Sequence, residues 1–313
     1  MQSTGNRSKR IAKLRGKFAR SCRPDGWSRL VVVIIILGVF PARASTIRDD
    51  QPDSGYLNLA TSPDYASVGL FVNNWGYTGC ATLVAPDWVL TAAHMFLAAN
   101  SGTFTINGVS YTGNQLITNP GWNGNAFAGS DLGLVHLTTS VTGVTPATLY
   151  TGSSESGQLG TFVGFGITGT GATGQNHFDG QERAFQNMID GDFGNPSLVI
   201  GSDFDNPLVP TDGQFGDTTP LALEGCVTSG DSGGAVFITI NGQVYLAGVI
   251  SAVVALDGSA NADYGDMSAF GRVTAFTPWI SSTIPEPSPA ALLLVGGLIL
   301  LGWRRAQRQC RTA

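Results

Sequence analysis

Lysine is absent between Ser45 and Ser281, and arginine occurs there only at Arg48, Arg183 and Arg272. The same stretch contains 20 aspartate or glutamate residues, which gives it a formal charge of −17. A surface so poor in cations repels polyphosphates and anionic lipids, so we expect no nucleic-acid partner. Solubility alone is the simpler explanation of this acidic balance.

Long helical periodicity is also missing from this stretch, whereas glycine is abundant, with 42 residues in a chain of 313. Two Asn-Gly pairs, at 107–108 and 241–242, separate short runs rich in β-branched and aromatic residues. Asn-Gly suits the positive φ angles of a type I′ turn, so each pair predicts a two-residue β-hairpin. Only Thr274 to Ile280 is a candidate helix. The pattern therefore predicts one all-β domain, at 45–281, with a short C-terminal helix.

The first 44 residues have the organisation of an export signal. Nine of the 17 basic residues precede position 30, and an unbroken apolar run extends from Leu30 to Phe40. Ala42 and Ala44 then place small side chains where a signal peptidase cuts. We therefore predict a secretory signal peptide over 1–44, cleaved after Ala44. An uncut signal anchor is the alternative, and the shortness of the apolar run argues against it.

Residues 282–313 consist of three parts in a fixed order. Pro285-Glu286-Pro287 is followed by an apolar segment from Ala290 to Trp303 and then by an arginine-rich tail. This order resembles the PEP-CTERM sorting signal of Gram-negative bacteria. The resemblance implies transient membrane association, processing by a sorting peptidase, and delivery to the periplasm, cell surface or extracellular matrix. A plain C-terminal membrane anchor is the alternative, and it also leaves the domain outside the cytoplasm.

Cysteine is scarce. Cys22 and Cys310 lie in the terminal segments, which leaves Cys80 and Cys226 in the central domain. Their spacing matches no metal-site pattern, so we predict no metal. In an oxidising compartment the two central cysteines could form a disulfide.

The segment Gly230-Asp231-Ser232-Gly233-Gly234 frames a serine with glycines on both sides. A serine hydroxyl is a weak nucleophile that needs an adjacent base and hydrogen-bond donors for the oxyanion it creates. The glycines allow a sharp turn, so that the backbone N–H groups of Gly230 and Ser232 could point at one oxyanion. The pentapeptide is uncommon but does not decide the function alone.

A histidine and an aspartate each occur at the end of an apolar stretch. His94 follows the stretch from Cys80 to Leu90, which we expect to be one strand. A single histidine in such a place is more often structural. Asp131 begins another buried-looking strand, where a carboxylate is costly unless an imidazole or similar group pairs with it, and a plain turn residue is the alternative. The other two histidines, His136 and His177, receive no role.

In the order His, Asp, Ser, these motifs resemble the trypsin/chymotrypsin-like serine proteases rather than subtilisin or the α/β-hydrolases. The likeness extends to Gly164-Phe165-Gly166, to Gly248-Val249-Ile250-Ser251 and to the closing segment from Phe270 to Ile280. It implies two six-stranded antiparallel β-barrels with the catalytic residues between them. It also implies an endopeptidase that acts on polypeptide substrates without a cofactor.

The resemblance implies a role for each motif residue. Ser232 is expected to be the nucleophile, His94 its general base and Asp131 the residue that orients the base. The N–H groups of Gly230 and Ser232 are expected to form the oxyanion hole, and Ser251 is expected to contact Asp131.

The substrate pocket follows from the same resemblance. Cys226, six residues before the nucleophile, is expected at the pocket floor, Val253 at its entrance and Ser268 on the opposite wall. The strand that carries Ser251 is expected to pair with the substrate backbone. An uncharged floor and a branched side chain at the entrance predict cleavage after small or medium uncharged residues.

Three features depart from the family pattern. Met95 replaces a cysteine, so the disulfide beside the catalytic histidine is missing, and Ala235 replaces a proline. The chain also lacks the Ile-Val-Gly-Gly segment whose freed amino group pairs with the aspartate before the serine, here Asp231. Activation by a trimmed Ile47, by a cut after an internal arginine, or by no switch at all remains open.

Two other functions compete with proteolysis. A non-catalytic, protease-like module that binds a surface partner would have lost a residue of the triad, and none is lost. A structural matrix protein would leave the three ordered motifs unexplained.

Overall fold

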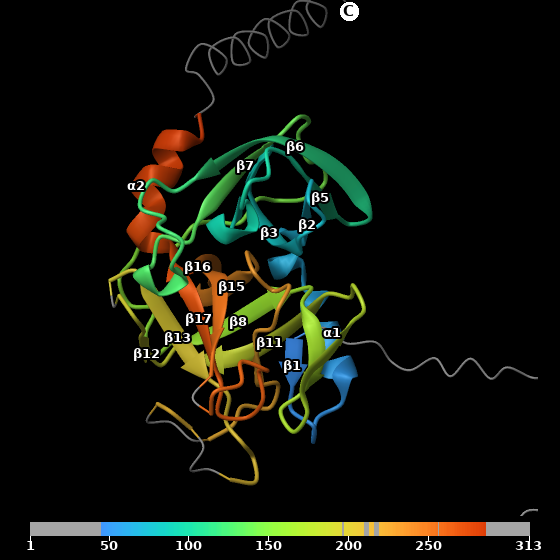
Figure 1. Ribbon diagram of the computed structural model, residues 1–313, viewed down its shortest axis with the longest axis vertical. Helices are drawn as coiled ribbons and strands as arrows, with labels where there is room; N and C mark the ends of the chain where they lie inside the picture. Colours follow the sequence, from blue (N-terminus) through green and yellow to red (C-terminus); the bar gives the residue numbers. More distant parts are fainter. Residues whose placement is uncertain (1–44, 196, 210–212, 216–218, 256, 286–313) are drawn as a thin grey trace, which may run out of the picture. The chain divides into compact units, whose positions relative to one another are not determined.

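The computed structural model describes residues 45–285, except residues 196, 210–212, 216–218 and 256. The predicted signal peptide, at 1–44, and the apolar and basic parts of the predicted sorting segment, at 286–313, lie outside the described residues. The described chain is mostly β-structure, with three short 3₁₀ turns and two short helices, α1 (Asp53–Ala60) and α2 (Val273–Thr283) (Figure 1). Neither of these helices is long and apolar enough to cross a membrane.

The first half of the domain is a closed antiparallel barrel in the strand order β2-β3-β4-β7-β6-β5. Its strands are β2 (Val68–Asn73), β3 (Thr78–Ala85), β4 (Trp88–Thr91), β5 (Gly102–Ile106), β6 (Val109–Thr118) and β7 (Gly133–Leu137). Asn107 and Gly108 have φ angles of 50° and 73° and join β5 to β6, as the Asn-Gly signal predicts.

The expected single strand from Cys80 to Leu90 is instead a hairpin. A turn at Pro86-Asp87 separates β3 from β4, which pair antiparallel. Proline has no N–H to donate to a strand ladder, so the apolar run is interrupted at that point. The consequence for the site is that His94 follows β4, the second strand of this hairpin.

The second half is an open half-barrel, and here the structure differs from the expected second six-stranded barrel. Seven strands pair in the order β11-β8-β15-β16-β17-β13-β12, and a second sheet pairs in the order β10-β9-β1-β14. The edge strand β12 is only two residues long. Within the described residues it does not pair with β11, the strand at the other edge, so the sheet does not close. The all-β class and the division into two barrel-like halves are confirmed (Figure 1).

The strands of the second half have the following bounds. The larger sheet contains β8 (Leu159–Gly164), β11 (Arg183–Met188), β12 (Gly191–Asp192), β13 (Val199–Asp203), β15 (Ala235–Ile240), β16 (Gln243–Val254) and β17 (Met267–Arg272). The smaller sheet contains β1 (Ser45–Ile47), β9 (Ile167–Thr170), β10 (Gly174–Phe178) and β14 (Gly225–Cys226). The Asn-Gly hairpin between β15 and β16 is confirmed, with φ angles of 52° at Asn241 and 79° at Gly242.

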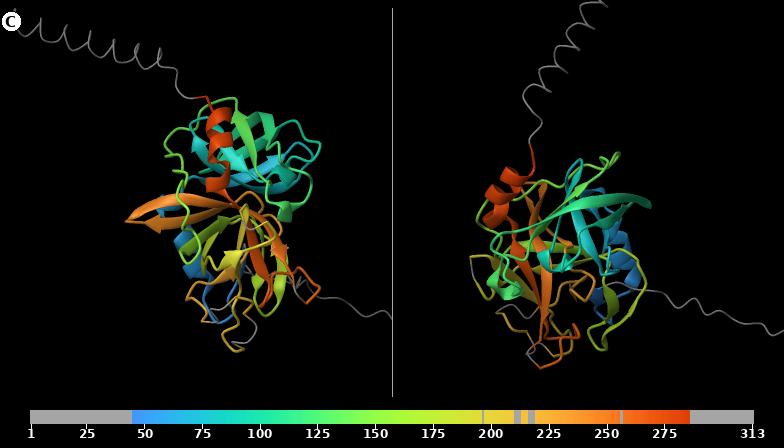
Figure 2. Two further views of the ribbon diagram at one scale, coloured as in Figure 1. Left: turned by 90° about the vertical axis from the view of Figure 1, so that its left-hand side faces the viewer. Right: turned by 45° about the horizontal axis from the view of Figure 1, so that its top comes forward.

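The expected C-terminal helix is present as α2, which extends to Thr283, beyond the predicted limit of 280. Its apolar residues Val273, Phe276 and Ile280 are buried in the same hydrophobic cluster as residues of the closed barrel. Figure 2 shows α2 beside that barrel. Helix α1 was not expected, because its eight residues include a glycine, Gly55, and are too few to show a helical period.

Strand β1 is the element that most affects the site. It precedes the closed barrel in sequence, yet it lies in the second half, antiparallel to β14 and parallel to β9. All three of its residues are buried, with at most 1% of each exposed. The three residues that follow the predicted signal cut are therefore part of the interior of the half-barrel.

Candidate active site

His94 and Asp131 form a two-point contact. His94 lies in a 3₁₀ turn (Ala93–Met95) that begins just after β4, and Asp131 lies just before β7, the barrel strand that pairs with β4. The backbone N–H of His94 donates to Asp131 Oδ1 at 2.8 Å, and Asp131 Oδ2 is 2.7 Å from His94 Nδ1. Because the carboxylate holds both the backbone and the ring, it fixes the imidazole orientation and leaves Nε2 as the nitrogen available for proton transfer.

Ser251, in β16, donates a third hydrogen bond to this carboxylate, from Oγ to Asp131 Oδ2 at 2.6 Å. Asp131 is 1% exposed, whereas the side chain of His94 remains 31% exposed. A buried carboxylate needs such partners, and here they come from both halves of the domain. The expected contact between Ser251 and Asp131 is confirmed.

The loop that carries Ser232 lies directly on the closed barrel. The backbone N–H of Cys80, in β3, donates to the carbonyl of Ser232 at 2.8 Å. Gly233 has a φ of 82°, and a Cβ at this position would lie 2.1 Å from Thr91 Oγ1 and 2.2 Å from the carbonyl oxygen of Cys80. The glycine after the serine is therefore required for this close approach, in addition to its backbone conformation.

His94 and Ser232 line one cavity of about 420 Å³. The exposed aromatic side chains of Tyr77 and Phe178 also line this cavity, together with Ile167. Nothing in the sequence indicated these three residues, because they lie in loops or at strand ends without a recognisable motif. The cavity brings a candidate nucleophile and a candidate base to the same solvent-accessible space.

Gly230 adopts a φ of 96°, a left-handed conformation that favours glycine. Its carbonyl oxygen accepts a hydrogen bond from Cys80 Sγ at 3.2 Å. Because this contact fixes the peptide plane that follows Gly230, it restrains the backbone between the two N–H groups expected to form an oxyanion hole.

Asp231 points away from the cavity and is fully buried. Its carboxylate accepts hydrogen bonds from the N–H of Gly166, from the N–H and Oγ1 of Thr228, and from Ser45 Oγ at 3.0 Å. Burial raises the pKa of Asp231, and these hydrogen bonds oppose that increase. Sequence reasoning considered Ile47 as the partner of Asp231, and the structure places Ser45 there.

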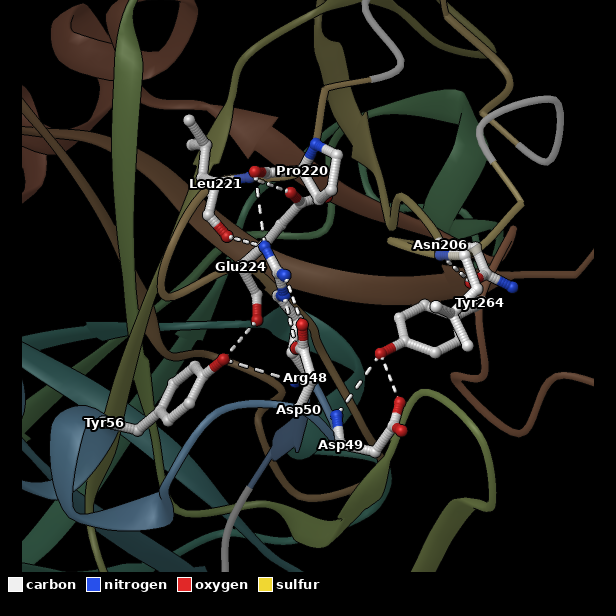
Figure 3. A network of polar contacts seen from close by, with 10 residues as sticks. Arg48, Asp49, Asp50, Tyr56, Asn206, Pro220, Leu221, Glu224 and Tyr264 are labelled. Carbon is white, nitrogen blue, oxygen red and sulfur yellow. Dashed lines mark hydrogen bonds and ion pairs between the residues drawn. The ribbon is translucent and has the colours of Figure 1, made fainter.

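A polar network holds the segment after β1 in place (Figure 3). The Arg48 guanidinium forms an ion pair with Asp50 at 2.7 Å and donates to the carbonyl of Leu221 at 2.7 Å. Tyr56 accepts a hydrogen bond from the N–H of Arg48 and donates one to the carbonyl of Glu224 at 2.9 Å. The network fastens the chain beyond β1 to the loop that leads into β14, and it therefore supports the position of Ser45.

The expected substrate-pocket residues separate into two pairs. Ser251 and Val253 line a second cavity, of about 220 Å³, which also reaches Ser232 and Val227. Cys226 and Ser268 do not line it: they are 0% and 1% exposed, and Ser268 Oγ lies 3.5 Å from Cys226 Sγ. Residues of this second cavity are therefore accessible beside Ser232, whereas Cys226 and Ser268 are not.

The expected disulfide is absent, because Cys80 and Cys226 are free and buried. Each thiol lies among different partners: Cys80 with Gly230 and the N–H of Phe165, and Cys226 with Ser268. Burial raises the pKa of both thiols, which disfavours the reactive thiolate.

Comparison with known sequences places this geometry in a family context. The Trypsin family matches residues 60–196, which include His94 and Asp131 and end before Ser232. The chain is similar to the trypsin/chymotrypsin-like serine proteases. It is 29% identical over 228 residues to chymotrypsin-like elastase family member 1 of Macaca fascicularis, covering 67% of this chain and 80% of the relative. The corresponding proteins of Rattus norvegicus and Homo sapiens are each 28% identical, over 232 and 225 residues, and cover 67% and 66% of this chain and 80% and 81% of the relatives. The trypsin-family match and these relatives support the conclusion that the chain is a hydrolase of the serine protease type.

Proposed function

We propose that the protein is an exported serine endopeptidase in which Ser232 is the nucleophile, His94 the general base and Asp131 the residue that orients His94. The observation that supports this proposal most strongly is the two-point contact between His94 and the buried Asp131, in a cavity shared with Ser232. His94 Nε2 would take the proton of Ser232 Oγ as that oxygen attacks the peptide carbonyl, and would then give it to the leaving amine. Water would hydrolyse the acyl-enzyme, and no cofactor takes part.

The N–H groups of Gly230 and Ser232 would stabilise the oxyanion. The hydrogen bond from Cys80 to the Gly230 carbonyl and the positive φ of Gly230 support this role, since both restrain the backbone of the loop. A donor already in place costs no reorganisation when the negative charge develops.

For the substrate, we propose cleavage after small or medium uncharged side chains. The cavity of about 220 Å³ lies next to Ser232, and the branched side chain of Val253 lines it. A peptide library should therefore be cut mainly after alanine or valine. Val253→Gly should enlarge the cavity and shift the preference to larger residues, and dominant cleavage after arginine or lysine would refute the pocket while leaving the triad in place.

For maturation, we propose that removal of residues 1–44 frees the α-amino group of Ser45, which then pairs with the carboxylate of Asp231. A cut after Ala44 would make Ser45 the first residue, and Ser45 Oγ already lies 3.0 Å from Asp231 Oδ2. A free α-ammonium there would supply a cation to a buried carboxylate. Later trimming to Ile47 would remove Ser45. We therefore favour cleavage of the signal peptide as the step that creates the new N-terminus.

The terminal segments complete the proposed function. We propose an export signal at 1–44 and a PEP-CTERM-type segment at 282–313 that associates transiently with the membrane and is processed by a sorting peptidase. The enzyme would then act on polypeptides in the periplasm, at the cell surface or in the extracellular matrix. Intact-mass analysis of protein from its native cell tests both cuts, and a full-length mass would contradict both.

Hydrolysis of a denatured protein substrate tests the proposed activity. The processed protein should hydrolyse it, whereas Ser232→Ala and His94→Ala should not, because loss of a triad residue typically removes several orders of magnitude in rate. Equal hydrolysis by Ser232→Ala would refute the nucleophile. A protein that binds substrate but never cleaves it would favour the binding-module alternative.

A further inference from the structure

A third cavity, outside the candidate active site, has a volume of about 490 Å³. Its lining residues come from the closed barrel, from the end of α1 and from the connection between β10 and β11. Its volume falls within the range typical of ligand sites, roughly 300–1,000 Å³. The cavity is therefore large enough to accept a side chain from another polypeptide.

The walls of this cavity are mainly apolar. Val68 and Leu70 of β2, Ile106 of β5 and Phe165 all line it. Phe165 also connects this wall with the Ser232 loop, because its N–H donates to Cys80 Sγ, which in turn donates to the carbonyl of Gly230. Such walls suit an aliphatic chain rather than a fully polar ligand.

One acidic side chain lines this cavity, that of Glu182. Its side chain is half-buried. The Oε1 atom is shielded from solvent and has no hydrogen-bond partner, so a ligand in the cavity can meet the carboxylate only through its other oxygen, Oε2. Burial raises the pKa of Glu182 to about 8. A buried carboxyl in this state is unfavourable when charged, unless a cation or hydrogen-bond donor approaches it.

The described residues do not supply that cation. Their three arginines form ion pairs with other carboxylates: Arg48 with Asp50, Arg183 with Asp53 and Arg272 with Glu155. No lysine occurs between Ser45 and Ser281. A cation that pairs with Glu182 must therefore come from outside the described part of the chain.

We propose that this cavity, with Glu182 at its wall, is a binding site for a lysine side chain of another polypeptide. The aliphatic stem of lysine would pack against Val68, Leu70 and Ile106, while the ammonium would pair with the accessible oxygen of the Glu182 carboxylate, Oε2. A compact ammonium suits one free carboxylate oxygen, whereas the planar guanidinium of arginine favours two. The formal charge of −17 between Ser45 and Ser281 attracts such a ligand over longer distances.

The experiment is a calorimetric titration of the full-length protein with Nα-acetyl-lysine methylamide, in which the ε-ammonium is free. N-acetyl-norleucine methylamide, which has a similar stem without the charge, is the ligand control. Glu182→Gln should weaken lysine binding by at least about tenfold, because a charge-assisted hydrogen bond is lost. Asp64→Asn, which removes an exposed charge in the neighbouring 3₁₀ turn, should bind as the wild type does.

A second variant tests the cavity without altering the carboxyl. Ala66→Phe adds a large side chain at a residue that lines the cavity, so it should also abolish binding. Circular dichroism checks that both variants fold. The proposal is overturned if the wild type shows no saturable binding, if Glu182→Gln or Ala66→Phe binds normally, or if the norleucine analogue binds equally well.

The source of the lysine is distinguished by kinetics. If the lysine belongs to the substrate, Glu182→Gln should raise KM for lysine-containing peptides and leave kcat unchanged. If it belongs to a separate partner, both constants should stay the same while lysine binding is lost. Either result retains the site, and neither depends on whether Ser232 is the nucleophile, because binding is measured independently.

Discussion

The closed barrel and the open half-barrel differ in how many charged side chains they bury. In residues 68–137, all of them described, Asp131 is the one buried acidic or basic side chain. The half-barrel and its loops bury several carboxylates, among them Asp203, Asp205, Glu224 and Asp231. Burial raises the pKa of Glu224 to about 8 and that of Asp266 to about 6. The half that contains Ser232 therefore desolvates more carboxylates on folding than the half that contains His94.

The two halves also supply different parts of the candidate site. The barrel supplies the base and its orienting carboxylate from neighbouring strands, β4 and β7, which pair directly. The half-barrel positions the serine loop through Asp231, whose partners come from β1 and from Gly166 and Thr228. Changes in the barrel should therefore alter proton transfer, and changes around Asp231 should alter the geometry of the serine loop.

The largest effect is expected in the barrel, from Asp131→Asn. The amide preserves the shape but cannot act as the same acceptor for His94, so kcat should fall about 10⁴-fold. Steady-state kinetics on a peptide substrate measures this. Asp87→Asn is the matched control, because Asp87 and His136 form an exposed aspartate–histidine pair, 3.4 Å apart, in the same barrel. A loss below tenfold for Asp131→Asn would contradict its role.

A smaller effect is expected in the half-barrel, from Ser45→Ala. The substitution removes one hydrogen bond to Asp231, so we expect kcat/KM to fall about tenfold and stability to fall by about 1 kcal/mol. The exposed Ser54→Ala, in α1, should change neither quantity. Kinetics and chemical unfolding of the processed protein provide the comparison. An unchanged Ser45→Ala protein would show that the Ser45 hydroxyl does not act on the serine loop.

The pH dependence of stability is expected to show the smallest effect and to originate in the half-barrel. Burial raises the pKa of Asp190 to about 7 and that of Glu224 to about 8. Between about pH 4 and 8 the folded state therefore binds more protons than the unfolded chain, so stability falls as the pH rises. The Tm should be lower at pH 8.5 than at pH 5 by about 5 °C, and Glu224→Gln should reduce this difference. A higher Tm at pH 8.5 would contradict the sign.

Local turn chemistry made part of the fold predictable. Asn107-Gly108 and Asn241-Gly242 indicated their hairpins because only a few residue types adopt their φ angles. The open edge of the half-barrel was not predictable, since strand closure depends on pairings between distant residues. Helix α1 was missed for a local reason, because it is too short for periodicity to identify it.

The candidate site was predictable where motifs carry the chemistry. His94 and Asp131 are bonded as expected, and Ser232 shares a cavity with His94. The position of Cys226 was not predictable, because burial beneath a cavity and exposure within it produce the same sequence signal. The contact between Ser45 and Asp231 joins residues 186 positions apart, and no local pattern indicates such a pair.

Covalent labelling with a fluorophosphonate probe, followed by peptide mass mapping, identifies the nucleophile. We expect one labelled serine, Ser232, in the wild-type protein, and no labelling in Ser232→Ala or His94→Ala. Correct folding of both variants is checked by circular dichroism. Labelling of another serine, or undiminished labelling of Ser232→Ala, would contradict the assignment of Ser232 as the nucleophile.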